Sequence, residues 1–544
     1  MRLRVEWAYI GILLIAPFLL FHGVLGAYWR ADDPAILLHA VSSPGLSAFY
    51  DPLVWRKLSP SNLTPWLTLS FQLDHRLAGA APAFFYAHQV IACAAVAVAA
   101  YVLARSWAPP LVAFLGGLLF LVGAPTASVA ELLMTRHYLE GLLLALLALL
   151  AFLRALERRQ LRWAWMGSLA YALAVTAKEV YVPLVLILLA VPRGGLRERL
   201  RMVWPFLIVA GLYVPWRGYM LGALLGGYAA QTGSPGSALV EIGHAALRLP
   251  ALVLGPQWRV LGAALLVLLA IGVRRHLHFA ALAGVVALAV LAPLIPLVRS
   301  PGITGPDRYL FVPWFVLCMG VTFLARIGWA HRQDARWAVL APVLLCGVLA
   351  GFSLSYQHAE RAVRAPVYRE FEVQGRFIDQ AQARQGMVPS DGLLAGYWYA
   401  TGLLGLRAQA GAAGPVMLIR GFPQQAPVDV LFRYDAARQD MRPVEGALQP
   451  FIAQWTASDQ SDPLVVDLRL YDAAASWKLG PYDQGQYFIV SESTGRYPIP
   501  REGRIKIVFD TLSFQIQHQS PEGRLTASPV LNVQPGGHVA WSRP

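Results

Sequence analysis

The sequence predicts an α-helical polytopic membrane protein. About eleven transmembrane helices are expected in residues 1–355, followed by an extracytoplasmic α+β domain in residues 356–544. Of the 544 residues, 57% are hydrophobic and only 14% are charged, whereas a soluble globular chain is typically about 45–50% apolar and about 25% charged. The apolar runs also stop near residue 355. This composition excludes a purely soluble, a collagen-like or a disordered protein.

Eleven apolar stretches approach the length of about 20 residues that a helix needs to cross a bilayer. They lie at residues 7–27, 83–103, 110–124, 138–155, 163–177, 180–192, 202–220, 260–273, 279–298, 309–325 and 338–355. Several are short enough to be tilted, broken or re-entrant. The first stretch has an alternative interpretation as a cleaved signal peptide, since small residues lie near its end. We favour a retained span, because the alternation of loops described next requires it.

The basic residues alternate between loops in a way that orients the chain. Arginines cluster at 2–4, 105, 154–162, 193–201, 274–275 and 326–336, whereas the intervening loops carry few. The positive-inside rule therefore places the N-terminus in the cytoplasm and the C-terminal domain outside, in a bacterial inner membrane. The same arginines account for much of the net charge of +14, which favours membrane topology over nucleic-acid binding. No nucleic-acid partner is expected.

Two segments depart from the membrane pattern. Residues 28–82 form a long first extracytoplasmic loop that belongs to the predicted membrane domain. After residue 355 a charged helical segment, 358–384, precedes strand-like runs. In the run 466–470, three apolar residues alternate with Asp467 and Arg469, the period of a half-buried strand. Further strands are predicted at 487–490 and 505–509, with a turn at 535–537.

The ionisable residues of the membrane part gather at the predicted outer ends of spans. They are Asp32 and Asp33, Arg136 and His137, Lys178 and Glu179, and Asp307 and Arg308. A carboxylate at this surface can take a proton from an attacking hydroxyl or amine. Arginine and lysine nearby can neutralise a phosphate leaving group. The pattern therefore indicates chemistry on a substrate with a lipid tail and a polar head, such as a lipid-linked sugar. Glu140 falls within a predicted span and is expected to face the protein interior or water.

Five short segments resemble motifs of membrane glycosyltransferases with the GT-C fold, over about residues 1–330. The segment 31–34, Ala-Asp-Asp-Pro, resembles their first-loop acidic motif. The stretch 69–82 with His88 resembles the loop leading to the second span in the protein O-mannosyltransferase-like branch. Residues 135–139, 177–179 with Pro183, and 307–313 resemble that branch's Arg-Ala-Asp-Leu, Ser-Lys-Glu and Glu-Arg-Tyr-Leu-Tyr-x-Pro motifs. Aminoarabinose and arabinose transferases of bacterial envelopes are equally plausible relatives.

The resemblance implies an inverting transferase that moves a hexosyl or pentosyl group. Its donor would be a polyprenyl-phosphate-linked sugar, and its acceptor a protein or an envelope glycolipid at the outer face of the membrane. One residue of the pair Asp32 and Asp33 would be the general base. The implied substrate-binding residues are Lys178, Glu179, Arg308, Arg136, His137 and Tyr309. Two departures stand out: Leu63-Thr64-Pro65 replaces the usual Tyr-Arg-Pro, and Tyr138 replaces the aspartate of Arg-Ala-Asp.

Each of these residues also has a structural interpretation. Asp33 suits the N-terminus of a helix beginning at Pro34. Lys178 with Glu179 could be an interfacial ion pair. Arg308 could be a membrane anchor beside an aromatic belt. The C-terminal domain shows no catalytic motif, so a lid or acceptor-recognition role is favoured.

Other functions remain open from the sequence. They are a transporter or flippase of a lipid-linked saccharide and a structural subunit of envelope assembly. No metal ligands are expected: Cys93, Cys318 and Cys346 lie in apolar runs without metal-ligand spacing and are expected to be packing residues. The sequence requires no cofactor, and it leaves a divalent metal open.

Overall fold

The structure is a computed structural model. It describes residues 2–191, 193–222, 251–254, 259, 262–263, 284–286, 289–290, 308–330, 337–381, 384–388, 396–412, 417–419, 428–450, 462–471, 474–491, 495–505 and 511–544. The chain divides into two compact units. The first comprises residues 1–27 and 62–364, and the second comprises residues 28–61 and 365–544. The predicted division at 355/356 had assigned residues 28–61 to the membrane part, whereas they cluster here with the C-terminal part.

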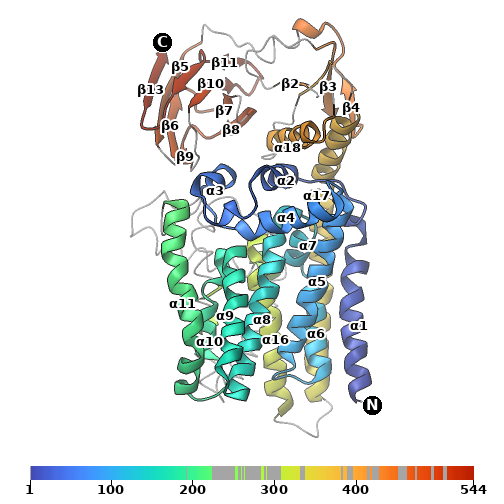
Figure 1. Cartoon of the computed structure of the whole chain (residues 1–544). Helices are drawn as coiled ribbons and strands as arrows, with labels where there is room; N and C mark the ends of the chain where they lie inside the picture. The colour runs from blue at the N-terminus through green and yellow to red at the C-terminus, as the bar shows by residue number, and fades with distance from the viewer. Residues whose placement is uncertain are drawn as a thin grey trace. The chain divides into compact units, whose positions relative to one another are not determined.

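The first unit is helical. Its helices are α1 (Arg2–Leu20), α4 (Pro65–Ala78), α5 (Pro82–Ala104), α6 (Pro110–Leu121), α7 (Ala124–Ala130), α8 (Arg136–Arg158), α9 (Leu161–Ala177), α10 (Leu184–Ala190), α11 (Leu196–Leu221), α16 (Phe311–Ala330) and α17 (Trp337–Gln380), the last running on into the second unit. Short 3-10 turns are η1 (His22–Val24), η3 (Leu133–Thr135), η4 (Glu179–Tyr181) and η7 (Arg308–Leu310). In Figure 1 α5, α6, α8 and α9 run alongside one another, and α4 lies across their ends.

Sequence features set where these helices start and how closely they approach. Proline stands in the first turn of α4, α5 and α6, where its missing N–H costs nothing and its fixed φ favours the helix. Glycine permits two close approaches in the bundle. A Cβ on Gly116 would lie 2.0 Å from Thr322 of α16, and one on Gly141 would lie 2.3 Å from Tyr181. These glycines therefore bring α16 against α6, and η4 against α8.

Two described helices are long and apolar enough to cross a membrane. They are the segments Pro82–Ala104 and Leu133–Arg158, and the bent pair α6 and α7, which meet at 61°, would make a third. Within the described residues, the other predicted spans that can be compared also fold as helices, but they do not meet the same test of length and apolarity. Most of the predicted spans 260–273 and 279–298 lies outside the described residues. The prediction of about eleven spans therefore stays a prediction.

The second unit combines helices with three sheets. Its helices are α2 (Asp33–Ser42), α3 (Pro52–Leu58), α18 (Gly396–Gln409) and the end of α17, with the 3-10 turn η2 (Ser47–Phe49). The first sheet has the order β2-β1-β3-β4, with β1 (Gln385–Met387) parallel to both neighbours. Its other strands are β2 (Met417–Leu418), β3 (Val430–Asp435) and β4 (Asp440–Pro443). The predicted charged helix at 358–384 is confirmed as far as Gln380.

The remaining two sheets share one apolar core. One has the order β13-β5-β6-β9, and the other has the order β11-β10-β7-β8 with β12 on β10. The strands are β5 (Leu464–Tyr471), β6 (Ala474–Gly480), β7 (Gln486–Ser491), β8 (Gly495–Ile499), β9 (Glu502–Ile505), β10 (Leu512–Gln519), β11 (Leu525–Ala527), β12 (Leu531–Val533) and β13 (His538–Arg543). Leu468 and Trp477 from one sheet pack with Phe514 and Ile516 from the other. The two sheets therefore form a β-sandwich.

The strand predictions can be compared directly with this sandwich. The alternation at 466–470 is confirmed, because the apolar residues of β5 are buried in the shared core. The strand predicted at 487–490 is β7. The turn at 535–537 joins β12 to β13, with Gly536 at φ 79°. Of the strand predicted at 505–509, Ile505 ends β9 and the rest lies outside the described residues.

Candidate functional site

A cluster of basic side chains lies near the start of α8 and the end of α9 in the first unit, close to Arg308 of η7. His137 and Tyr138 lie in the first turn of α8, and Lys178 follows the last residue of α9. The Lys178 ammonium lies 5.2 Å from the centre of the Tyr138 ring, and that ring centre lies 4.7 Å from the centre of the His137 ring, with the two planes inclined by 37°. Arg308 acts electrostatically on both Lys178 and His137. The fold thus gathers three residues of the sequence prediction, which we call the cation cluster: His137, Lys178 and Arg308.

Lys178 is more deeply buried than Arg308, the other charged side chain of this cluster. Its side chain is 8% exposed, and it makes no hydrogen bond or ion pair to any side chain that the structure describes. Burial lowers the pKa of Lys178 to about 8. The Glu179 carboxylate opposes this shift and the Arg308 charge adds to it. A buried ammonium without a bonded counter-ion is costly to the protein, so the position is suited to a ligand that brings a negative charge.

His137 adds a second polar group in need of a partner. It is 7% exposed, and neither ring nitrogen makes a hydrogen bond of ordinary geometry within the described part of the chain. The backbone of Met134 offers it a looser polar contact. Buried polar groups in proteins almost always have a partner. An anion held by Lys178 could supply one.

Glu179 has a different role from the adjacent lysine. Its carboxylate accepts hydrogen bonds from Arg217 Nε at 3.2 Å and from a terminal nitrogen of Arg217 at 3.3 Å. It also accepts the backbone N–H of Leu63 at 3.2 Å. The predicted alternative of a Lys178–Glu179 ion pair is thus not formed. Arg217 was missed by the sequence analysis, although a charged residue inside the apolar stretch 202–220 was a signal for it.

Arg136 is enclosed in a polar network inside the bundle. It is fully buried, and its guanidinium donates to Asp74 at 2.5 Å, to Ser70 at 3.2 Å, to Gln89 at 3.2 Å and to the Phe85 carbonyl at 2.7 Å. These partners come from α4 and α5. Arg136 therefore ties three helices together, and this geometry favours positioning of α8 over direct contact with a substrate.

The same network continues to a second carboxylate, Glu140. This residue is 8% exposed, which confirms that it faces the protein interior. It accepts hydrogen bonds from Trp66 and Ser70, each at 2.8 Å. His88 bridges the two carboxylates, with Nδ1 2.8 Å from Asp74 and Nε2 3.2 Å from Glu140. The residues of the 69–82 motif and His88 thus meet Arg136 in one cluster.

The two aspartates of the first loop lie in the second unit, at the start of α2. Asp33 is fully buried, and its carboxylate accepts the backbone N–H of Arg30 at 3.0 Å. Asp32 is only half-buried and stands at the helix N-cap position. Ala31, directly before it, has φ 47°, a left-handed conformation that costs a non-glycine residue roughly 1–2 kcal/mol. The structure therefore separates the pair into a buried Asp33 and a more accessible Asp32.

Helices α17 and α18 hold the turn that carries Asp32 and Asp33, which we call the acidic turn. A Cβ on Gly402 of α18 would lie 2.5 Å from the backbone nitrogen of Ala35 in α2, and one on Gly405 would lie 2.4 Å from Leu38. The guanidinium of Arg30 stacks on the Tyr368 ring at 4.1 Å. Tyr28 donates a hydrogen bond to Asp379. The C-terminal part of the chain thus holds α2 in place.

The remaining predicted residues lie around η7. Arg308 is half-buried beside its neighbour Tyr309, with its guanidinium 5.0 Å from the tyrosine ring centre. Asp307 lies outside the described residues. Cys93, Cys318 and Cys346 are buried free thiols, as expected for packing residues. Within the described residues, no group of three or more histidine, cysteine, aspartate or glutamate side chains is arranged to hold a metal ion.

Comparison with known proteins gives similarity to solved structures. No protein-family model matches the chain, and no curated protein matches it by sequence. Among solved structures, the chain is similar to the arabinosyltransferase EmbB from Mycobacterium smegmatis, with 14% sequence identity and a TM-score of 0.33. The match covers 98% of this chain but 61% of that one, so this chain spans about three fifths of the length of EmbB. A function for this chain must therefore be argued from its own residues.

Proposed function

We propose that this protein is a multi-pass membrane glycosyltransferase that takes a sugar from a polyprenyl-phosphate-linked donor. The observation that carries the proposal is Lys178, a buried ammonium to which no carboxylate of the described residues bonds, grouped with Arg308 and His137. The order of the GT-C-like motifs along the chain supports it. The acceptor would be an envelope glycolipid or a protein, and the sugar a hexose or pentose.

The cation cluster has the charge that a phosphate requires. Lys178 and Arg308 contribute two positive charges, while the nearby Glu179 is held by Arg217. Charge-assisted hydrogen bonds are about twice as strong as neutral ones, and burial strengthens them further. Negative charge builds on the phosphate as the sugar leaves, so these side chains would favour the transition state over the bound donor. His137 would add one hydrogen bond, and Tyr309 would support Arg308.

The chemical step needs a base for the acceptor. The acceptor oxygen or nitrogen attacks the anomeric carbon, the bond from that carbon to the phosphate oxygen breaks, and the polyprenyl phosphate departs with the electron pair. A carboxylate takes the proton from the acceptor. We assign this role to Asp32, because Asp33 is fully buried and already accepts a backbone hydrogen bond. Arg136 and Glu179 would then act as positioning residues.

The topology follows from arginine placement. The N-terminus would be cytoplasmic, and the C-terminal domain extracytoplasmic, in a bacterial inner membrane. Cysteine accessibility labelling in intact cells tests this orientation. A cysteine introduced at an exposed residue of the β-sandwich, such as Lys478, should react with a membrane-impermeant reagent, and one at Arg4 should not.

Mass spectrometry of envelope glycoconjugates tests the activity. Cells producing the wild-type protein should carry a sugar that is absent from cells producing Asp32→Asn, while the Asp33→Asn protein retains some transfer. Both variants must insert in the membrane at wild-type levels. Full transfer by a protein with both substitutions would refute the assignment. Movement of a lipid-linked sugar without a new glycosidic bond would instead indicate a flippase.

A further inference from the structure

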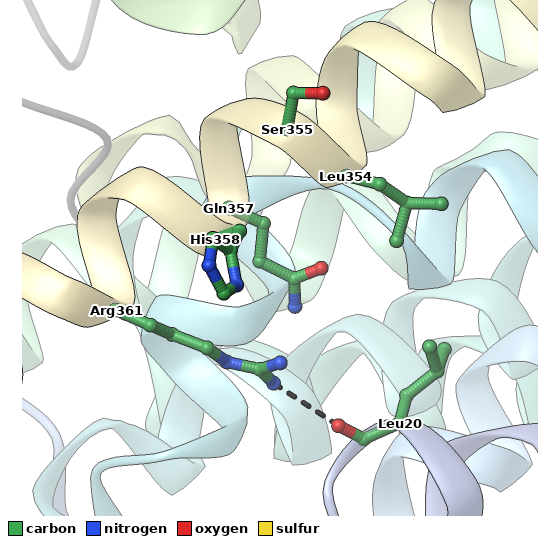
Figure 2. A pocket seen from close by; sticks show the side chains of 6 residues that line it. All are labelled: Leu20, Leu354, Ser355, Gln357, His358 and Arg361. Carbon is green, nitrogen blue, oxygen red and sulfur yellow. Dashed lines mark hydrogen bonds between the residues drawn. The ribbon is translucent and has the colours of Figure 1, made fainter.

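A pocket opens beside the end of α1, against the middle of α17. Its volume is about 500 Å³, and Figure 2 shows the residues that line it: Leu20, Leu354, Ser355, Gln357, His358 and Arg361. All six belong to the first unit. None of them belongs to the cation cluster or to the acidic turn, so the pocket is separate from the proposed transfer chemistry.

The polar residues of this pocket offer hydrogen-bond donors that the protein does not use. Gln357 is 1% exposed, and its side-chain nitrogen has no hydrogen-bond partner within the described residues. In Figure 2 its amide points into the space between Arg361 and the two leucines. Arg361 binds Glu131 through Nε at 2.5 Å and the Leu20 carbonyl through one terminal nitrogen at 3.1 Å. The other terminal nitrogen of Arg361 makes no hydrogen bond to any described residue.

The pocket lies where α17 changes character. Residues 337–356 of this helix are mostly apolar, and charged residues follow from His358 onward. Large apolar side chains are exposed along both helices that border the pocket. They are Ile12, Ile15 and Leu19 on α1, and Leu344, Val348, Phe352 and Leu354 on α17. An exposed apolar belt that ends in polar residues is the pattern expected at a membrane interface.

We infer that this pocket binds the phosphodiester headgroup of a glycerophospholipid, with the acyl chains along the apolar surfaces of α1 and α17. The phosphodiester carries acceptor oxygens for the unused donors of Gln357 and Arg361, and for the exposed Ser355 and His358. Its single negative charge would be met by the Arg361 guanidinium, which it would share with Glu131. The leucines contact the start of the acyl chains. The inference does not depend on the proposed function.

Thermal unfolding of the delipidated full-length protein in detergent tests the site. Adding phosphatidylglycerol should raise the melting temperature of the wild type. Gln357→Leu should give about fivefold weaker retention of this lipid, as expected for the loss of one hydrogen bond, and native mass spectrometry counts the bound lipid directly. Without lipid, Gln357→Leu should melt no lower than the wild type, because an unpartnered buried amide is replaced by an apolar group.

Two comparisons make the result decisive. Gln374→Leu is the matched control, since Gln374 is equally buried on the same helix but lies outside the pocket, and it should retain lipid normally. His358→Ala changes an exposed residue and should weaken retention without affecting folding. Wild-type lipid retention by both pocket variants would overturn the inference. So would an equal melting shift with millimolar inorganic phosphate alone, which would indicate a site for free phosphate.

Discussion

Replacing Lys178 by methionine should make the empty protein more stable and the enzyme much less active. In the structure the ammonium is buried and contacts the Tyr138 ring, and no carboxylate in the described part of the chain bonds to it. Methionine keeps the length and apolar stem of lysine but removes the charge. If Lys178 served only to hold the fold together, the same substitution would destabilise the protein.

The size of the gain follows from the proton affinity of Lys178. Because a tenfold change in proton affinity is about 1.4 kcal/mol, the fall of the Lys178 pKa from 10.5 to about 8 corresponds to a cost of roughly 3 kcal/mol. Loss of the contact between the Lys178 ammonium and the Tyr138 ring destabilises the variant by about 0.5–1 kcal/mol. The substitution Lys178→Met should therefore increase the free energy of unfolding by about 2 kcal/mol at pH 7.

The cost of burying the Lys178 charge should also appear in the pH dependence of stability. Below about pH 8, Lys178 is charged in both the folded and the unfolded protein, and the full cost is present. As the pH rises from about 8 towards 10.5, the folded protein loses this proton while the unfolded chain keeps it, so this group makes the fold more stable. The gain should be missing in Lys178→Met.

Two assays on the same preparations decide the matter. Thermal unfolding in detergent measures stability, and transfer from a polyprenyl-phosphate sugar measures activity. Losing a charge-assisted bond to the phosphate should lower kcat/KM by about 10- to 100-fold. Lys478→Met, which changes an exposed lysine of β6, should alter neither quantity. A destabilised Lys178→Met protein with normal transfer would refute the reasoning.

Four further substitutions test the rest of the arrangement. Arg136→Met removes the arginine charge from the buried Asp74 carboxylate and leaves it only the contact with His88, so it should cost about 3 kcal/mol, measured as loss of folded protein; normal folding would contradict the network. Gly402→Val forces a side chain against the backbone of α2 and should destabilise the protein by about 1–3 kcal/mol. It should also lower kcat by a larger factor than it changes the KM for the donor. Gly320→Ala, with open space around the glycine, should change neither stability nor kcat. Asp33→Ala should destabilise the protein by about 1–3 kcal/mol, because it removes a buried hydrogen-bond acceptor. Asp32→Ala should abolish most transfer and leave stability nearly unchanged. A destabilised Asp32→Ala protein and an inactive but stable Asp33→Ala protein would exchange the two roles.

Several features of this protein could be predicted from the sequence because they depend on local pattern. Apolar runs predicted helices such as α5 and α8, since burial or lipid exposure of a whole helix requires apolar residues along its length. The alternation at 466–470 predicted β5, because side chains in a strand point to opposite faces in turn. Positions of Lys178, Arg308 and His137 next to helix ends singled them out as candidates for one site.

Tertiary structure decided which of these residues have partners. The sequence places Lys178 beside Glu179, but the fold gives the carboxylate to Arg217 and leaves the ammonium with an aromatic ring. Arg136 and His137 are neighbours in the chain, yet one is enclosed by four hydrogen-bond partners, whereas the ring nitrogens of the other make no hydrogen bond of ordinary geometry within the described residues. Adjacent residues in a helix point about 100° apart, so they meet different surroundings.

The contacts of the acidic turn could not be predicted from the sequence either, because they join residues far apart in the chain. The sequence marks Asp32 and Asp33 as a pair in the first loop, and nothing in that loop indicates that α18, more than 350 residues later, packs against it. The small residues Gly402 and Gly405 allow that approach only because α2 happens to present its backbone and Leu38 there. Such contacts depend on the path of the whole chain, because the free energy of packing is set by which surfaces meet and not by their order in sequence.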